Sequence, residues 1–256
     1  MTLPFDFPVV FRLGSLALPA HLLFEVAAFF LGYRLYVTLR GRQQDPISDE
    51  HRVWILIGAA AGAFVGSRVL GALQHPAVFD DARWWLLVFQ SKTIVGGLLG
   101  GLIGVEATKK GLGVTRSSGD LFTYPLILAI AVGRVGCFLT GVYEPTYGAP
   151  TSLPWGLDLG DGIPRHPTAL YEIFVLTGIA LVLVLRERRR PFGEGLRFQA
   201  FMVAYLAWRL GIGFIQPGTP LLGSFTAIQL ACVGGLAYYA WLAIRRRRAT
   251  MSPVSP

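Results

Sequence analysis

Long apolar stretches recur along this chain, and they constrain its fold more than any other feature. Because a helix needs about 20 mainly apolar residues to cross a bilayer, we expect seven spans: 17–39, 53–74, 93–108, 119–140, 168–186, 196–215 and 224–244. Only 15% of the residues are charged and 53% are hydrophobic, whereas soluble domains carry about 25% charged residues. The sequence therefore predicts an all-α, polytopic membrane bundle forming a single domain over residues 1–256.

Basic residues gather after every second apolar stretch. They are Arg40 and Arg42, then Lys109, Lys110 and Arg116, then the arginines of 186–190, and finally 245–248. Positively charged loops remain in the cytoplasm, so the N-terminus is expected outside and the C-terminus inside. The net charge of +8 is explained by this topology, and we expect no nucleic-acid partner. A basic stretch ahead of an apolar core is missing at the N-terminus, so we expect no cleaved signal peptide.

Three loops are expected on the outer side. Residues 75–92 contain Trp84 and Trp85, a pair typical of a membrane-interface anchor. Residues 141–167 form the longest and most polar loop, whose prolines and glycines exclude a long helix. Residues 216–223 form a tight turn, and the polar end of the chain, about 249–256, is expected to be disordered.

Glycines dominate the third apolar stretch, in "GGLLGGLIG" at 96–104. No strand is predicted before it, so a phosphate-binding loop is not indicated. Glycines allow helix backbones to approach closely in lipid. We interpret this stretch as a helix-packing surface, and for the short segment 93–108 two alternatives stay open, a full span or a broken one.

Ionisable residues are costly inside a membrane, so each one is a candidate for function. The set is Glu25, Arg68, Lys92, Glu106, Arg134, Glu172 and Arg209. Lys92 and Glu106 lie near span ends, where long side chains reach water. Two roles remain open for Arg134 and Arg209: an ion pair with Glu25, Glu144 or Glu172, or binding of a lipid phosphate, which guanidinium groups hold well.

The long outer loop ends in further polar groups, including Asp158, Asp161, Arg165 and His166. Pro167 suits the first turn of the next helix and keeps His166 outside it. His166 is then either a general base or a hydrogen-bonding group at the rim. No His, Cys and Asp spacing indicates a metal site, and no nucleophile elbow is present, so we expect no metal and no cofactor. Cys137 and Cys232 are interpreted as buried small residues, although a covalent role for Cys137 stays open.

Several of these segments together resemble the prolipoprotein diacylglyceryl transferase family. Its Gly-Arg-x-Gly-Asn-Phe-x-Asn stretch is similar to 133–140, followed by Glu144 and by Tyr147-Gly148. Its Arg-His-Pro-x-x-Leu-Tyr-Glu motif matches 165–172, and its Gly-Ala-Arg resembles 66–68. Its late-span arginine matches Arg209, and "SFTAIQL" resembles the start of its last helix.

The resemblance implies a bacterial inner-membrane enzyme that moves diacylglyceryl from phosphatidylglycerol to the lipobox cysteine of a preprolipoprotein. Membrane lipids and these two substrates are the implied partners. By this match Arg134 and Arg209 hold the phosphate, and Glu144 orients the headgroup or the arginines. The catalytic set is then Arg134, Glu144, His166 and Arg209, and the substrate-binding set is Arg68, Gly133, Gly136, Gly148, Arg165, Tyr171 and Glu172.

The chain also departs from the family pattern. The two motif asparagines are Cys137 and Thr140, and the histidine before the paired glycines is Val95. The glutamate after the late arginine is Gly213, and "HLLFE" at 21–25 stands where a tyrosine is expected. His166 or Glu25 then becomes the candidate base. The alternatives are a lipid-group transferase with a different acceptor and a non-enzymatic phospholipid-binding or transport protein.

Overall fold

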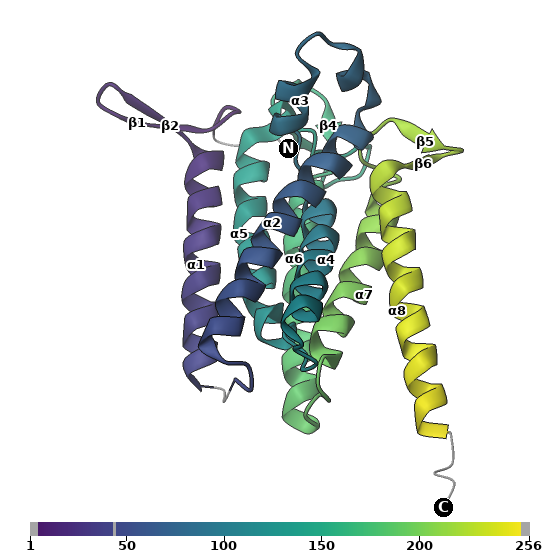
Figure 1. Cartoon of the computed structure of the whole chain (residues 1–256). Coiled ribbons are helices and arrows are strands. Elements are labelled where there is room, and N and C mark those ends of the chain that lie inside the picture. The colour runs from purple at the N-terminus through teal and green to yellow at the C-terminus, as the bar shows by residue number, and fades with distance from the viewer. Residues whose placement is uncertain (1–4, 43–44, 252–256) are drawn as a thin grey trace, which may run out of the picture. The chain divides into compact units, whose positions relative to one another are not determined.

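The computed structural model describes residues 5–42 and 45–251. Over these ranges it contains eight α-helices (Figure 1). They are α1 (Ala20–Arg42), α2 (Asp49–Gln74), α3 (Trp84–Gln90), α4 (Ile94–Leu112), α5 (Thr123–Thr140), α6 (Thr168–Arg189), α7 (Leu196–Ile212) and α8 (Ala227–Met251). Short 3₁₀ helices are η1 (Pro76–Asp80), η2 (Asp120–Phe122) and η3 (Gly141–Tyr143).

Most of the long helices have the length and composition of membrane spans. Five segments in the described part of the chain qualify: Ala20–Arg42, Asp49–Gln74, Asp120–Tyr143, Thr168–Arg189 and Ala227–Arg248. The pair α3 and α4, bent by 86° at its break, gives a sixth if it is taken as one span. The prediction of a polytopic helical membrane protein is confirmed at this level. Since α7 has only 17 residues, the total of seven spans stays a prediction.

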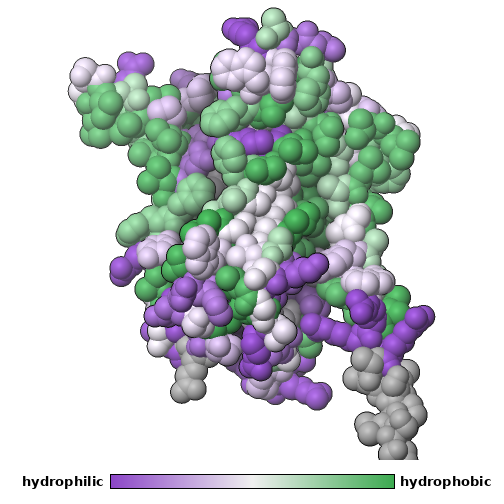
Figure 2. All heavy atoms as spheres, in the orientation of Figure 1, coloured by the Kyte–Doolittle hydropathy of each residue, from purple (hydrophilic) through white to green (hydrophobic). Residues whose placement is uncertain are grey.

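Large apolar side chains cover the lipid-facing sides of these helices. Phe29 and Phe30 of α1 and Phe174 of α6 are largely exposed. Figure 2 shows such side chains as green atoms along the helices. Hydrophilic atoms gather instead near the end of α8, where residues 245–248 are all arginine. Exposed apolar groups on helix flanks and charges at helix ends are the pattern that a bilayer requires.

The chain divides into two compact units, and the first comprises Met1–Ser48, Arg116–Phe201 and Ile212–Pro217. In this unit α1 packs along α5, and α5 packs against α6. Small residues bring α1 and α5 together: a Cβ on Gly32 would lie 3.1 Å from the Cβ of Ala129. At the end of α5, Gly136 similarly lies against Phe24 and His21.

An N-terminal hairpin ties the start of α1 to the end of α5. It consists of β1 (Val10–Leu13) and β2 (Leu16–Pro19), paired antiparallel. Just before it, the N–H of Val9 donates to the carbonyl of Leu139 at 2.9 Å, and the carbonyl of Val9 accepts from Ala20 at 3.0 Å. Val9 therefore holds the start of α1 and the end of α5 together.

The opposite end of α5 is fastened by Asp120. Its carboxylate accepts hydrogen bonds from the backbone N–H groups of Gly195, at 2.6 Å, and Phe198, at 2.9 Å. It thereby caps the beginning of α7, whose first N–H groups have no partner within the helix. Arg197 adds hydrogen bonds to the carbonyl of Asp120 and to Glu187, the latter at 2.8 Å.

The second unit comprises Asp49–Thr115, Met202–Gly211 and Gly218–Pro256, and its central feature is a backbone-to-backbone contact between α2 and α4. Three glycines of α2 face three of α4, pairing Gly66 with Gly96, Gly62 with Gly100 and Gly58 with Gly104. At each of these positions an added Cβ would collide with a carbonyl of the facing helix. The prediction that 96–104 is a packing surface is confirmed.

The start of α8 is capped by its own sequence. The N–H of Thr226 donates to Gln229 Oε1 at 3.0 Å, and the N–H of Gln229 donates to Thr226 Oγ1 at 3.4 Å. This is a capping box, which satisfies two backbone donors reciprocally. Gln229 Nε2 also reaches the carbonyl of Leu210, at 3.3 Å, linking α8 to α7. The hairpin of β5 (Pro220–Leu222) and β6 (Phe225–Thr226) leads into this cap.

Some expectations about the loops were wrong in detail. Residues 75–92 contain η1 and the helix α3, which begins at Trp84. Pro167 is the residue before α6 and not its first residue. Hairpins, including β3 (Leu157–Asp158) with β4 (Pro164–Arg165), were not predicted. Helix α8 continues to Met251, so the predicted disordered tail loses 249–251, and its remainder, 252–256, lies outside the described residues.

Candidate active site

A buried ion pair joins α5 and α6 in the first unit. Arg134 Nε lies 3.0 Å from Glu172 Oε2, and the two side chains are only 5% and 1% exposed. Of the three carboxylates considered as partners for this arginine, Glu172 forms the pair. Arg134 Nη1 also donates to Cys137 Sγ, one helical turn further along, at 3.7 Å. A guanidinium has five donors in a plane, so one arginine can hold a carboxylate and an anionic ligand together.

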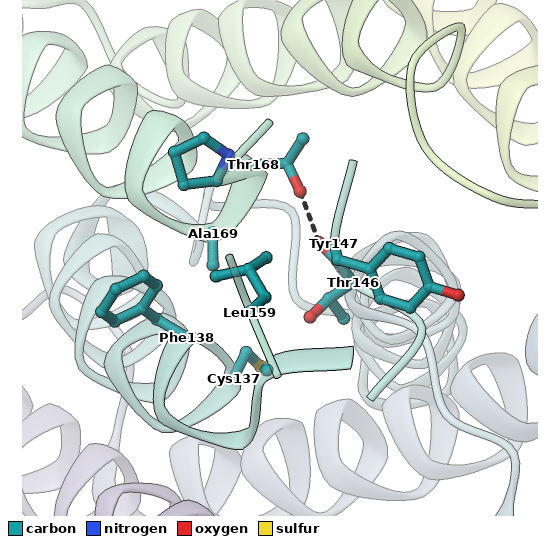
Figure 3. A pocket seen from close by; sticks show the side chains of 9 residues that line it. Cys137, Phe138, Thr146, Tyr147, Leu159, Thr168 and Ala169 are labelled. Carbon is teal, nitrogen blue, oxygen red and sulfur yellow. Dashed lines mark hydrogen bonds between the residues drawn. The ribbon is translucent and has the colours of Figure 1, made fainter. Parts of the chain in front are cut away.

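A small cavity opens beside this pair (Figure 3). Its walls come from the end of α5, the following loop and the first turn of α6. The lining residues are Cys137, Phe138, Gly141, Thr146, Tyr147, Leu159, Pro167, Thr168 and Ala169. Thr168 Oγ1 donates to the carbonyl of Thr146, and Gln216 Nε2 donates to both of these groups at 3.2 Å. The thiol of Cys137, the start of α6 and the polar network around Thr168 thus all border the cavity.

Gly148 and His166 meet at the entrance to α6. The N–H of Gly148 donates to the carbonyl of His166 at 3.0 Å, and a Cβ at Gly148 would collide with His166 and Thr168. The N–H of His166 in turn donates to the carbonyl of Ala149 at 3.1 Å. These contacts keep His166 outside the helix, as predicted. The backbone at Gly148 lies so close to His166 that only glycine fits there without a shift.

The ring of His166 belongs to a chain of aromatic polar groups. Its Nδ1 lies 3.2 Å from the hydroxyl of Tyr171, and that oxygen accepts a hydrogen bond from Trp155 Nε1 at 2.8 Å. The Tyr171 oxygen therefore links the Trp155 indole to the His166 imidazole, and the tautomer of the imidazole decides which partner donates in the second contact. This arrangement matches the predicted rim hydrogen bonding.

Arg165 stands on β4 and is held by its own hairpin. Its Nη2 lies 2.7 Å from Asp161 Oδ2, its Nε donates to the same oxygen at 2.8 Å, and its guanidinium lies over the ring of Tyr147 at 5.0 Å. The hydrogen bond from Arg165 lowers the pKa of Asp161, and the carboxylate raises the pKa of Arg165. Both groups are therefore charged at neutral pH.

Glu144 contributes to a second polar cluster, which contains a histidine that the sequence analysis did not select. His21 Nε2 lies 3.9 Å from Glu144 Oε2 and 3.8 Å from Glu25 Oε2. Glu25 and His21 are one turn apart on α1, while Glu144 directly follows η3. The spacing of a histidine and a glutamate four residues apart within an apolar stretch was the available signal.

Two predicted site arginines belong to the second unit. The guanidinium of Arg68 lies over the rings of Phe64 and Phe89, at 5.1 and 5.3 Å from their centroids, and its Nη1 donates to the carbonyl of Ser91 at 2.9 Å. It thereby braces the break between α3 and α4. Arg209 is buried on α7.

The remaining predicted positions are small or apolar. Gly136 is a contact point between α5 and α1, whereas a Cβ on Gly133 would meet only Ala28, at 4.0 Å. Val95 is buried in the first turn of α4. Among the described residues, no group of three or more His, Cys, Asp or Glu is arranged to hold a metal ion.

Comparison with known proteins places this chain among transferases of one family. The sequence model described as prolipoprotein diacylglyceryl transferase matches residues 8–245. A protein of Nitratidesulfovibrio vulgaris named phosphatidylglycerol–prolipoprotein diacylglyceryl transferase is 30% identical, and the alignment covers 97% of each chain. Proteins with the same name from Geobacter sulfurreducens and Legionella pneumophila are 30% and 29% identical, with 87% of each chain covered in the first and 94% of this chain and 99% of the relative in the second. The chain therefore belongs to the prolipoprotein diacylglyceryl transferase family.

Proposed function

We propose that this protein transfers the diacylglyceryl group of phosphatidylglycerol to the cysteine thiol of a preprolipoprotein lipobox, releasing glycerol phosphate. The observation that carries the proposal is the buried Arg134–Glu172 pair, 3.0 Å apart, within the two most specific motifs of the family. An arginine fixed by a carboxylate at the end of a membrane helix is suited to bind the phosphodiester of a lipid headgroup. It also stabilises the charge that develops as the phosphate leaves.

The protein is then a multi-pass component of the bacterial inner membrane, with seven spans, the N-terminus outside and the C-terminus in the cytoplasm. In this topology α7 crosses although it is short, and α3 with α4 forms one broken span. The end of α5, η3 and the start of α6 face the outer leaflet. The clusters at 186–190 and 245–248 stay on the cytoplasmic side, as the positive-inside rule requires.

The predicted site residues have different roles in this proposal. In the first unit Arg134 binds the phosphate and Glu172 fixes its guanidinium, while Arg209 has the phosphate-binding role that the family match implies. Gly136 lets α5 approach α1, Gly133 belongs to the substrate-binding set by the same match, and Gly148 shapes the turn before α6. Arg165, His166 and Tyr171 line the outer approach, and the family match gives Arg68 a substrate-binding role.

A reconstituted assay tests this function. The purified protein is placed in vesicles of phosphatidylglycerol with a lipobox peptide, and mass spectrometry follows the peptide. A thioether adduct carrying one diacylglyceryl group is expected. The matched control is the same peptide with its lipobox cysteine replaced by serine, which should stay unmodified. An unmodified cysteine peptide, beside an active family member in parallel, would contradict the proposal.

A second candidate is transfer to a different acceptor, such as another thiol or a hydroxyl. It is favoured by Val95, which is buried and apolar where the family pattern has a histidine. Consumption of phosphatidylglycerol and release of glycerol phosphate without a lipobox adduct would support this candidate over the first.

A further inference from the structure

His21 has a setting that the family pattern does not account for. Its Nε2 lies within 4 Å of two carboxylates, at 3.8 Å from Glu25 and 3.9 Å from Glu144. Each carboxylate stabilises the positive charge that an imidazole acquires when it takes up a proton. The three side chains are half-buried at the end of a membrane-spanning helix, and ionisable groups in such places mark functional sites.

The backbone fixes His21 beside the motif that contains Arg134. Val9 bridges Ala20 at the start of α1 and Leu139 near the end of α5 through two hydrogen bonds. A Cβ on Gly136 would lie 3.2 Å from the Cα of His21, so glycine is what lets α5 approach the histidine. The cluster therefore lies at the same end of α5 as Arg134, Cys137 and the cavity.

The other histidines are less suited to accept a proton. The chain has four histidines. His51 is in the first turn of α2 and His75 precedes η1, both in the second unit. His166 faces the hydroxyl of Tyr171 through Nδ1. His21, in the first unit, lies within ion-pair distance of two carboxylates.

We propose that His21 is a catalytic residue, the base that accepts the proton of the attacking thiol, and that Glu25 and Glu144 are positioning residues for its ring. The inference rests on the proposed function. His21 Nε2 takes the proton from the lipobox thiol as the sulfur forms a bond to the glyceryl carbon. The bond between this carbon and the phosphate oxygen breaks, and its electron pair leaves with glycerol phosphate. The imidazolium then returns its proton to the released phosphate, so atoms and charge balance.

The charged groups facing the ring decide its pH behaviour. Glu25 comes from α1 itself and Glu144 from the segment after η3, whereas α5 presents Gly136 at this point. A base works only when it is unprotonated, so activity should fall on the acidic side of the profile.

The test compares initial rates of thioether formation in vesicles. We expect His21→Gln and His21→Ala to lower kcat by about 10²- to 10⁴-fold, the usual contribution of a general base, with a smaller change in KM for phosphatidylglycerol. Added imidazole should restore part of the His21→Ala rate. The control His75→Gln should retain the full rate, and thermal unfolding of each variant reports whether it is folded.

The outcomes separate this inference from the function beneath it. An active wild type with an equally active His21→Gln overturns the role of His21 and leaves the transferase standing. A wild type whose rate shows no acidic limb overturns it as well, even if the His21 variants do not fold. A wild type that never modifies the lipobox peptide removes the proposed function and this inference together.

Discussion

The helix pairs α2–α4 and α1–α5 both pack closely through small residues, but they differ in the residues at the contact. In α2–α4 the contact consists of glycine facing glycine at three levels, and backbone meets backbone throughout. In α1–α5 the contact begins with Gly32 against Ala129 but ends in His21, Glu25 and Glu144. Small residues are favoured at helix interfaces in lipid. The polar residues at the end of α1–α5 are therefore not needed for packing. The difference separates a contact that only holds the fold from one that is suited to chemistry.

The largest effect is expected from the buried Arg134–Glu172 ion pair, which joins α5 to α6. Arg134→Ala should lower the transfer rate by at least about 100-fold, because a donor to the developing phosphate charge is lost. It should also lower the free energy of unfolding by about 3–5 kcal/mol, because Glu172 remains buried without its cation. Rates in phosphatidylglycerol vesicles and unfolding of the purified protein measure the two losses.

A double variant separates the two losses. Arg134→Met combined with Glu172→Leu replaces the pair by apolar side chains of similar size and should regain most of the stability. Activity should stay absent. A double variant that still transfers lipid would show that the ion pair serves packing alone.

The next effect concerns the glycine interface. Gly62→Ala places a methyl group against the carbonyl of Gly100, and a backbone cannot move aside as a side chain can. We expect a loss of about 3 kcal/mol in the free energy of unfolding, the upper end for overpacking. The control is Gly111→Ala, where nothing lies within 4 Å; it should be neutral or slightly stabilising. Equal stability of both variants would mean that α2 and α4 are not in backbone contact.

A smaller effect is expected along α1–α5. Gly32→Ala brings a methyl group to 3.1 Å from the Cβ of Ala129 and 3.3 Å from the carbonyl of Pro125. These contacts are looser than those of Gly62 and need only a small shift of the helices, so the cost should be about 1 kcal/mol. Gly133→Ala meets only Ala28, at 4.0 Å, and should unfold like the wild type. If its transfer rate nevertheless falls, Gly133 faces the substrate; an unchanged rate would remove it from the predicted binding set.

The smallest effect is the pH response of an exposed ion pair. Because Arg165 lowers the pKa of Asp161, the pair stabilises the hairpin above the ordinary pKa of an aspartate, about 3.9. The contribution is lost as the pH falls through the lowered value. Hydrogen exchange at Ile163, measured from pH 5 downward and corrected for intrinsic rates, should show this opening. Asp161→Asn should remove the pH dependence; if it persists, another group is responsible.

The parts of the fold that depend on local pattern were predictable from the sequence. Apolar stretches located the long helices, and the glycines of 96–104 indicated a packing surface, because both signals lie within one helix. A broken span at 93–108 was left open, but the helix α3 was not predicted, since Trp84 and Trp85 are equally typical of a loop anchor and of a helix start. The cap on the start of α7 was not predicted either, because Asp120 lies far from it in the sequence.

The site was predictable only as far as single residues reveal it. Arg134 stood out because an arginine in an apolar stretch needs a reason. Its partner was left open among three carboxylates, since the choice of Glu172 depends on how α5 faces α6. His21 was overlooked because nothing near it in the sequence indicates Glu144, which arrives more than a hundred residues later through the fold.

The glycine faces of α2 and α4 also have a consequence for how the protein is made. During synthesis α2 enters the bilayer before α4. Until α4 arrives, the glycine face of α2 lacks the helix against which it packs. It must wait in lipid until the chain has passed through η1 and α3 and turned by 86° into α4. Only then can the two backbones come into contact. Assembly of the second unit is therefore limited by the insertion of α4. A chain truncated before Ile94 would lack the packing partner of α2, and we expect such a chain to be degraded.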